Sequence, residues 1–240
     1  MKIEPKIVYE DNHIIVVIKP HNISVQEDES KDIDMLTIIK DYIKERDQKP
    51  GNVFLGLVHR LDRPTGGVMV FAKTSKAASR LSEQMRDGDF DKTYHAIVCG
   101  KPRETKGKIV SYLKKDERTN TAQIVPQSTT GAKRAELDYE VLAYNNDTNH
   151  SLVKVKLYSG RGHQIRVQMK SIKCPVFGDQ KYGGEGMPKV MLNLFATELA
   201  FLHPVTKQKL IFRVYPPETS SAWNEFNIDK FLSIKSNVND

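Results

Sequence analysis

The segment His59-Arg60-Leu61-Asp62-Arg63-Pro64-Thr65-Gly66-Gly67 leads into the apolar stretch Gly67–Ala72, which predicts a buried strand. Two arginines and one histidine flank its single carboxylate, Asp62. Neighbouring cations favour the ionised form of a carboxylate, which can then act as a nucleophile or a base. Pro64 and the glycine pair predict a tight turn. By itself the pattern also fits a surface Asp–Arg pair at a strand-to-turn junction, and that explanation is the commoner one.

The composition is that of an ordinary globular protein with a modest basic surplus. The chain has 240 residues, which fits one large domain or a domain with a small appendage, and its formal net charge is +7. Basic surfaces attract polyanions, so the charge permits a nucleic-acid partner without requiring one. Cys99 and Cys174 form no CxxC pair, which excludes a four-thiolate zinc site and a disulfide framework and suits a reducing cytoplasm. The apolar run Ile14–Ile18 is too short for a signal peptide or a membrane span.

Short strands and helices are expected to alternate along the chain. The pattern predicts strands at 7–9, 14–18, 55–58, 67–72, 92–98, 135–144, 151–158 and 210–214, and helices at 35–49, 75–86 and 164–172. Ser75 is the expected N-cap of the second helix, and Gly88 its stop. The wholly polar stretch 114–120 is expected to project as a loop. The Lys-rich segment 101–118 is either a solvated face or an RNA-gripping loop. The mixture predicts an α+β fold on a large, mostly antiparallel mixed sheet with flanking helices and loops.

Further short motifs lie on both sides of the Asp62 segment. They are Lys19-Pro20, Lys92-Thr93-Tyr94, Gly160-Arg161-Gly162-His163-Gln164-Ile165-Arg166, Pro175-Val176-Phe177-Gly178-Asp179 with Tyr182-Gly183, and Leu199–Pro204 with Leu210–Phe212. Together with His59–Gly67 they resemble, in the same order, the motifs of the RluA-type family of pseudouridine synthases. The resemblance covers roughly residues 7–217, which makes chance similarity a poor explanation.

The chain departs from the family's pattern at four positions. Gly66 replaces a commoner serine and Gly162 the usual threonine, His21 stands in the region where a glycine often follows Lys-Pro, and Phe195 stands where histidine is frequent. The change at Gly66 substitutes one small residue for another and should leave the chemistry intact.

The resemblance implies an isomerase that converts uridine in RNA to pseudouridine. This reaction breaks the N1–C1′ bond and forms a C5–C1′ bond with no net redox change, so no cofactor and no metal are expected. Asp62 is then the catalytic carboxylate, which either attacks C1′ or removes a sugar proton on the way to a glycal. The sequence does not choose between these two routes.

The resemblance also assigns Tyr94 and Arg166 to the catalytic set. Tyr94 matches the family's active-site tyrosine, whose ring packs against the target base, and stacking tolerates rotation of that base. Arg166 matches the basic residue that pairs with the catalytic aspartate. Spacing alone would make Tyr94 a half-buried strand residue and Arg166 a helix-surface residue, with Arg161 a competitor for the second role.

His59, Arg60, Arg63, Arg161 and His163 are the expected RNA-binding residues. The family resemblance suggests that Arg60 fills the space left by the flipped uridine, while contact with a phosphate is an equally weighted alternative. His163 could suggest a metal site, but no second ligand lies at helical or hairpin spacing.

Many relatives carry an S4 domain ahead of the catalytic domain, and here we expect none because the first strand begins near Ile7. We expect a catalytic domain at 1–217 and a C-terminal helix or tail at 218–240, whose polar part after Phe231 is expected to fray. The expected partner of this cytoplasmic monomer is structured RNA, ribosomal or transfer, with neither DNA nor membrane involved.

Two other classes of function compete with this interpretation. A non-catalytic RNA-binding protein would not need an ionised carboxylate beside a polyanion, so Asp62, Tyr94 and Arg166 together argue against it. A nucleoside or glycoside hydrolase would use a second carboxylate. Asp179 is the candidate for that second group, and its Gly178-Asp179 setting predicts a turn.

Overall fold

The computed structural model describes residues 3–217 and 222–232, which fall into two compact units. The first unit comprises Met1–Asp91 and Glu198–Val214, and the second comprises Lys92–Thr197 and Tyr215–Asp240. The strand β10 (Leu194–Leu202) passes from the second unit into the first. The predicted domain limits at 217 and 218 remain a prediction, and the tail from 233 onward lies outside the described residues.

The first unit is built on antiparallel strands. The hairpin of β1 (Lys6–Glu10) and β2 (Ile14–Lys19) continues through β2 to β4 (Gly66–Ala72). The short β3 (Gly56–Leu57) also pairs with β4, and β11 (Lys209–Arg213) pairs with β10. Every residue of β4 is buried, as its continuous apolar sequence predicts. The register places Lys19 opposite Gly67, so the end of β2 lies beside the start of β4.

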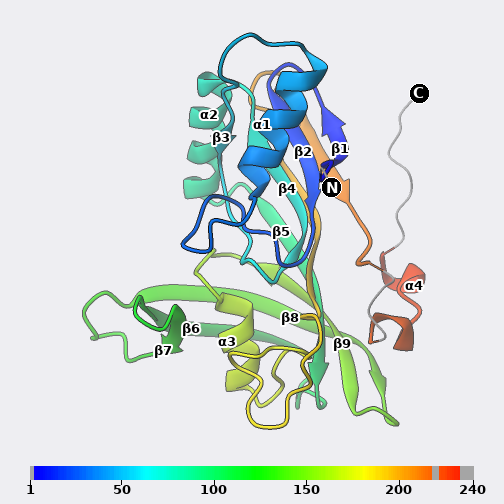
Figure 1. Cartoon of the computed structure of the whole chain (residues 1–240). Coiled ribbons are helices and arrows are strands. Elements are labelled where there is room, and N and C mark those ends of the chain that lie inside the picture. The colour runs from blue at the N-terminus through cyan, green and yellow to red at the C-terminus, as the bar shows by residue number, and fades with distance from the viewer. Residues whose placement is uncertain (1–2, 218–221, 233–240) are drawn as a thin grey trace. The chain divides into compact units, whose positions relative to one another are not determined.

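Two helices accompany these strands (Figure 1). Helix α1 (Met35–Arg46) begins at the N-cap Asp34, whose side chain accepts a hydrogen bond from the Thr37 amide, and it ends three residues before the predicted limit. Helix α2 (Ser75–Asp87) packs on β3 and β4. Its N-cap is Thr74, one residue before the predicted Ser75, because the Thr74 hydroxyl accepts from the Ala77 amide. Gly88 ends the helix in the left-handed conformation, as predicted.

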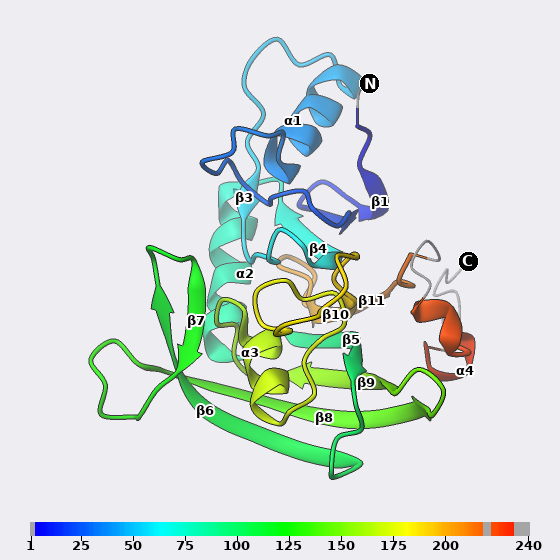
Figure 2. The ribbon, with the colours of Figure 1, turned by 60° about the horizontal axis from the view of Figure 1, so that its bottom comes forward.

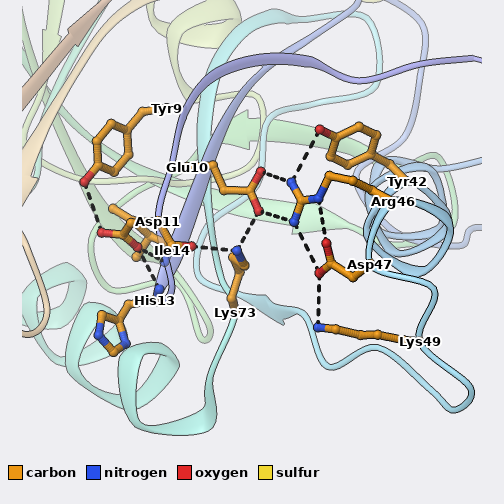
Figure 3. Close-up of polar contacts among 10 residues, drawn as sticks. All are labelled: Tyr9, Glu10, Asp11, His13, Ile14, Tyr42, Arg46, Asp47, Lys49 and Lys73. Carbon is orange, nitrogen blue, oxygen red and sulfur yellow. Dashed lines mark hydrogen bonds and ion pairs between the residues drawn. The ribbon is translucent and has the colours of Figure 1, made fainter.

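A polar network centred on Glu10 joins α1 to the strands of the first unit (Figure 3). The Glu10 carboxylate accepts from Arg46 at 2.6 and 3.0 Å and from the Lys73 ammonium at 2.5 Å. Lys73 also donates to the Asp11 carbonyl, and the Asp11 side chain accepts from the His13 and Ile14 amides. The network therefore ties together the β1–β2 turn, the end of α1 and the end of β4.

The second unit carries the strand order β5-β9-β8-β6-β7, with every adjacent pair antiparallel. The strands are β5 (Asp91–Cys99), β6 (Lys106–Asp116), β7 (Thr121–Ile124), β8 (Lys133–Asn145) and β9 (His150–Leu157). Helix α3 (Gln164–Ser171) contacts β6 and β7 (Figure 2). The polar stretch 114–120, predicted to project as a loop, contains the turn at 117–120 that joins β6 to β7, whereas its first three residues belong to β6.

The described C-terminal residues contact the β8–β9 hairpin. They form a 3-10 turn (Trp223–Glu225) and the short helix α4 (Asp229–Leu232). Glu225 accepts from the Thr148 hydroxyl at 2.6 Å and lies 3.0 Å from Nδ1 of His150. The predicted α+β class is confirmed, with mostly antiparallel strands and few helices. None of the helices in residues 3–217 and 222–232 is long and apolar enough to span a membrane.

We predict that Glu10→Gln lowers the free energy of unfolding by about 1–2 kcal/mol at neutral pH, because it removes the shared acceptor of two cations. Burial raises the pKa of Glu10, but Arg46 and Lys73 outweigh burial and lower it overall. A carboxylate with a lowered folded-state pKa loses its stabilising contribution as pH falls. In urea unfolding, the difference between the two proteins should therefore shrink in acid. Glu4→Gln, at an exposed position, is the control, and equal losses for both variants would contradict the prediction.

Candidate active site

Asp62 lies in a tight turn of the first unit that leads into β4. The Thr65 amide donates to the Asp62 carbonyl at 2.9 Å, which closes the turn, and Thr65 itself is buried. Gly67 has a φ of 134°, a conformation that side-chain-bearing residues rarely adopt. Glycine is therefore favoured at position 67, where the chain leaves the turn and enters the strand.

The Lys19 ammonium braces this turn from the end of β2. Its Nζ donates to the carbonyls of Pro20 at 2.8 Å, Ile23 at 2.6 Å and Arg63 at 3.0 Å. The residue is 0% exposed. Burial lowers the pKa of Lys19 to about 7, an effect that the nearby Asp62 carboxylate opposes. The brace therefore places a buried cation within electrostatic reach of Asp62.

Two further hydrogen bonds join the segment after Lys19 to the same turn. Nδ1 of His21 donates to the Pro64 carbonyl at 2.7 Å, and Nε of Arg63 donates to the Asn22 carbonyl at 3.2 Å. Burial lowers the pKa of His21, although the Pro64 carbonyl opposes this, so the imidazole is neutral at pH 7 and carries its proton on Nδ1. Asn22 has a φ of 63°, a left-handed conformation that asparagine tolerates better than most residues.

The other members of the His59 segment have different environments. Nε2 of His59 accepts from the Val70 amide at 3.1 Å, and its ring lies 6.3 Å from that of Phe90. Leu61 is buried, whereas Arg60 is exposed. His59 thus supports β4, and Arg60 presents its side chain to the solvent.

The guanidinium of Arg63 is held by an acidic loop. It bonds to the carboxylates of Asp28 and Asp32 and to the Ser30 hydroxyl, the last at 2.8 Å. The predicted RNA-binding residue Arg63 therefore has protein partners for its charge in this structure.

Tyr94 and Arg166 belong to the second unit. Tyr94 lies on β5 opposite Val155 of β9 and is 7% exposed. Arg166 lies on α3 and forms a bidentate pair with Asp179, with Nε at 2.7 Å and Nη2 at 2.6 Å from the two carboxylate oxygens. Both members of this pair are buried, at 3% and 1% exposure.

Asp179 is the centre of a small buried cluster. Besides Arg166, its carboxylate accepts from the amides of Lys181 and Tyr182, both at 3.0 Å. The Arg166 guanidinium lies over the Tyr182 ring, 5.0 Å from its centroid. The turn predicted at Gly178-Asp179 is present, but both carboxylate oxygens of Asp179 already accept hydrogen bonds. Asp179 is thus poorly suited to serve as the second carboxylate of a hydrolase.

The remaining predicted residues, His163 and Arg161, lie just before α3. Nδ1 of His163 is 2.7 Å from the Tyr182 hydroxyl, so this histidine contacts the cluster around Asp179. Arg161 is exposed and donates from Nε to the Arg134 carbonyl at 3.0 Å. Within the described part of the chain, no group of three or more His, Cys, Asp or Glu could hold a metal ion.

Lys19 and His21 are site residues to which the sequence alone assigned no role, and Asp179 was considered only as the second carboxylate of a hydrolase. A lysine at the end of an apolar strand is a usable signal, since burial of its ammonium requires several acceptors. His21 and Asp179 carry no comparable signal, because their partners are set by loop geometry.

Residues 13–171 match the family described as RNA pseudouridylate synthase. An uncharacterized RNA pseudouridine synthase of Bacillus subtilis is 33% identical over 208 residues, which are 87% of this chain and 67% of that protein. The chain belongs to the RNA pseudouridylate synthase family and is an isomerase that acts on uridines in RNA.

Two further relatives carry more specific names. The tRNA pseudouridine synthase C of Vibrio cholerae is 32% identical over 229 residues, covering 87% of this chain and 89% of that protein. The ribosomal large subunit pseudouridine synthase D of the same organism is 33% identical over 227 residues, covering 88% and 67%.

Solved structures share the fold. Human RNA pseudouridylate synthase domain containing 4 matches with a TM-score of 0.74 at 23% identity, over 89% of each chain. The predicted resemblance to the family and the predicted fold class are thus both confirmed.

We predict that Lys19→Met lowers the free energy of unfolding by about 3 kcal/mol or more, because three carbonyls lose a charged donor that methionine cannot replace. Urea unfolding followed by circular dichroism would measure this loss. Lys6→Met, an exposed substitution on β1, is the matched control. Similar unfolding midpoints for the two variants would contradict a bracing role for Lys19.

We predict that Asp179→Asn lowers the free energy of unfolding by about 3–5 kcal/mol, because it leaves the buried Arg166 guanidinium without its counter-charge. Asp147→Asn, in the exposed turn between β8 and β9, removes one charge without breaking a buried pair. A loss of less than about 1 kcal/mol on the same unfolding measurement would show that Asp179 does not hold Arg166.

Proposed function

We propose that this protein isomerises specific uridines in ribosomal or transfer RNA, with Asp62 as its catalytic carboxylate. The observation that carries the proposal is the brace on the Asp62 turn. A buried ammonium and a neutral histidine hold the backbone carbonyls of the two residues that follow Asp62. A loop that only connects two strands has no need of such a buried cation, whereas a carboxylate that must meet one sugar carbon needs a fixed backbone.

The chemistry assigned to Asp62 requires its ionised form. Either the carboxylate attacks C1′ while the N1–C1′ bond breaks, or it removes a sugar proton and a glycal forms. In both routes the detached uracil turns within the site and C5 bonds to C1′. This step releases the Asp62 carboxylate from C1′ in the first route and returns the sugar proton in the second. The proton lost from C5 is balanced by the one that N1 gains. Both routes need the carboxylate at a fixed place beside the sugar, and the hydrogen bond from Lys19 to the Arg63 carbonyl holds the backbone that carries Asp62.

Tyr94 and Arg166 complete the proposed catalytic set. Tyr94 provides an aromatic ring against which the uracil turns without leaving the site. Arg166 provides the cation that orients the Asp62 carboxylate, and Asp179 in turn fixes the guanidinium of Arg166. This division gives Asp179 a positioning role and leaves it out of the chemical steps.

The proposed RNA contacts fall to Arg60, Arg63 and Arg161. The exposed Arg60 is suited to fill the space vacated by the flipped base. The relatives' names support a structured substrate, since one is a tRNA pseudouridine synthase and another a ribosomal large subunit pseudouridine synthase. We propose that the chain acts as a cytoplasmic monomer without DNA or a membrane.

We predict that Asp62→Asn lowers single-turnover pseudouridine formation by at least about 100-fold, because the amide can neither attack C1′ nor take a proton. RNA affinity should change by less than about threefold, since the substitution removes no RNA contact. The substrate would first be identified by mapping pseudouridine across the stable RNAs of cells with and without this protein.

Asp41→Asn, on the exposed face of α1, controls for the loss of one negative charge. Restoration of every lost pseudouridine by the Asp62→Asn protein in the deletion strain would overturn the catalytic assignment. An unchanged pseudouridine map in that strain would instead favour a protein that binds RNA without turnover.

A further inference from the structure

The loop Glu27–Asp32, which lies between β2 and α1, is strongly acidic in a basic protein. Four of its six residues are acidic and one is a lysine, whereas the chain as a whole carries +7. All six residues are exposed. An exposed acidic loop beside the catalytic turn of an RNA enzyme repels the phosphates of its substrate, so the loop calls for an explanation.

Arg63 is the anchor of this loop. Nη1 of Arg63 lies 3.4 Å from an Asp28 oxygen and 2.8 Å from the Ser30 hydroxyl, and Nη2 bonds to Asp32. The other hydrogen bonds of the loop are internal, joining Ser30 to Asp28 and Asp32 to Ser30. Among the described residues, Arg63 is therefore the side chain outside the loop that holds it in place.

Asp28 and Asp32 contact the two terminal nitrogens of the Arg63 guanidinium, which are atoms through which arginine also binds a phosphate. A guanidinium binds a carboxylate and a phosphate with the same planar, two-pronged geometry. The Arg63 side chain is 36% exposed, and those of Asp28 and Asp32 are 39% and 60% exposed. Ion pairs this exposed contribute little to stability, so an incoming polyanion can exchange with them.

We propose that Arg63 binds a phosphate of the RNA backbone. In the absence of RNA the loop Glu27–Asp32 occupies its guanidinium, and the phosphate displaces Asp28 and Asp32 when RNA binds. The proposal rests on the proposed function, because Arg63 directly follows the catalytic Asp62 in the same turn. The loop imposes an electrostatic cost on any RNA that approaches the turn. An RNA that places a phosphate at Arg63 forms a new ion pair that offsets this repulsion, and an RNA that does not place one there gains no such compensation. The difference adds to substrate selectivity.

Binding of a fluorescein-labelled RNA hairpin with uridines in its loop tests this exchange over a series of salt concentrations. Binding requires no turnover, so the result stands whether or not pseudouridine forms. Asp28→Asn/Asp32→Asn should tighten binding by about threefold to tenfold, because the RNA no longer displaces two carboxylates. Asp87→Asn/Asp89→Asn, at the exposed end of α2, changes net charge by the same amount and should have a smaller effect.

Arg63→Gln distinguishes a phosphate contact from a structural clamp. The slope of log affinity against log salt should become shallower by about 0.7–0.9, the contribution of one phosphate contact, and Arg63→Lys should retain the slope. In the Arg63→Gln background, the gain from Asp28→Asn/Asp32→Asn should fall to that of the control pair. An unchanged slope in Arg63→Gln, or an equal gain in both backgrounds, would overturn the proposal. Far-ultraviolet circular dichroism of each variant confirms that it is folded.

Discussion

The fixed position of Asp62 depends on one buried ammonium group. Lys19 ends a strand whose other residues are almost all buried, and its three acceptors are all backbone carbonyls. A buried cation is costly unless it is fully hydrogen-bonded. The loop after β2 and the turn before β4 must therefore keep the conformations that present those carbonyls. His21 and the Asn22 carbonyl then join the same two segments, so that three hydrogen bonds hold the Asp62 turn at Arg63 and Pro64.

The second unit also contains a buried basic side chain, but there a carboxylate binds it in place of neutral carbonyls. Arg166 is buried on α3, and its charge is matched by Asp179 from the loop that follows the helix. The backbone amides of Lys181 and Tyr182 also donate to the Asp179 carboxylate and hold it in place. Each unit thus contains a buried basic residue, Lys19 bound by carbonyls in the first and Arg166 bound by a carboxylate in the second. Both arrangements restrict the backbone more strongly than a surface ion pair could.

The sequence predicted those features that depend on local pattern. The burial of β4 follows from its uninterrupted apolar run, and the Asp62 turn follows from Pro64 and the glycine pair. Strand β6 was not predicted, because its four lysines are exposed and give it the composition of a loop. The partners of Lys19 and Arg166 were not predictable either. They lie up to 44 and 13 residues away, and their contacts depend on loop conformations that periodicity does not report.

The arginines of the predicted RNA surface are not equivalent once their partners are known. Arg60 is exposed, Arg161 is tied to a backbone carbonyl, and Arg63 is neutralised by two carboxylates. The net charge of +7 therefore says little about where RNA is attracted, because attraction depends on which cations lack an internal counter-charge. Asp32 raises the pKa of Arg63 through their hydrogen bond, so this arginine stays charged while its field is cancelled locally. A charge cancelled by an exposed loop can be restored by moving that loop, whereas the buried charge of Arg166 cannot.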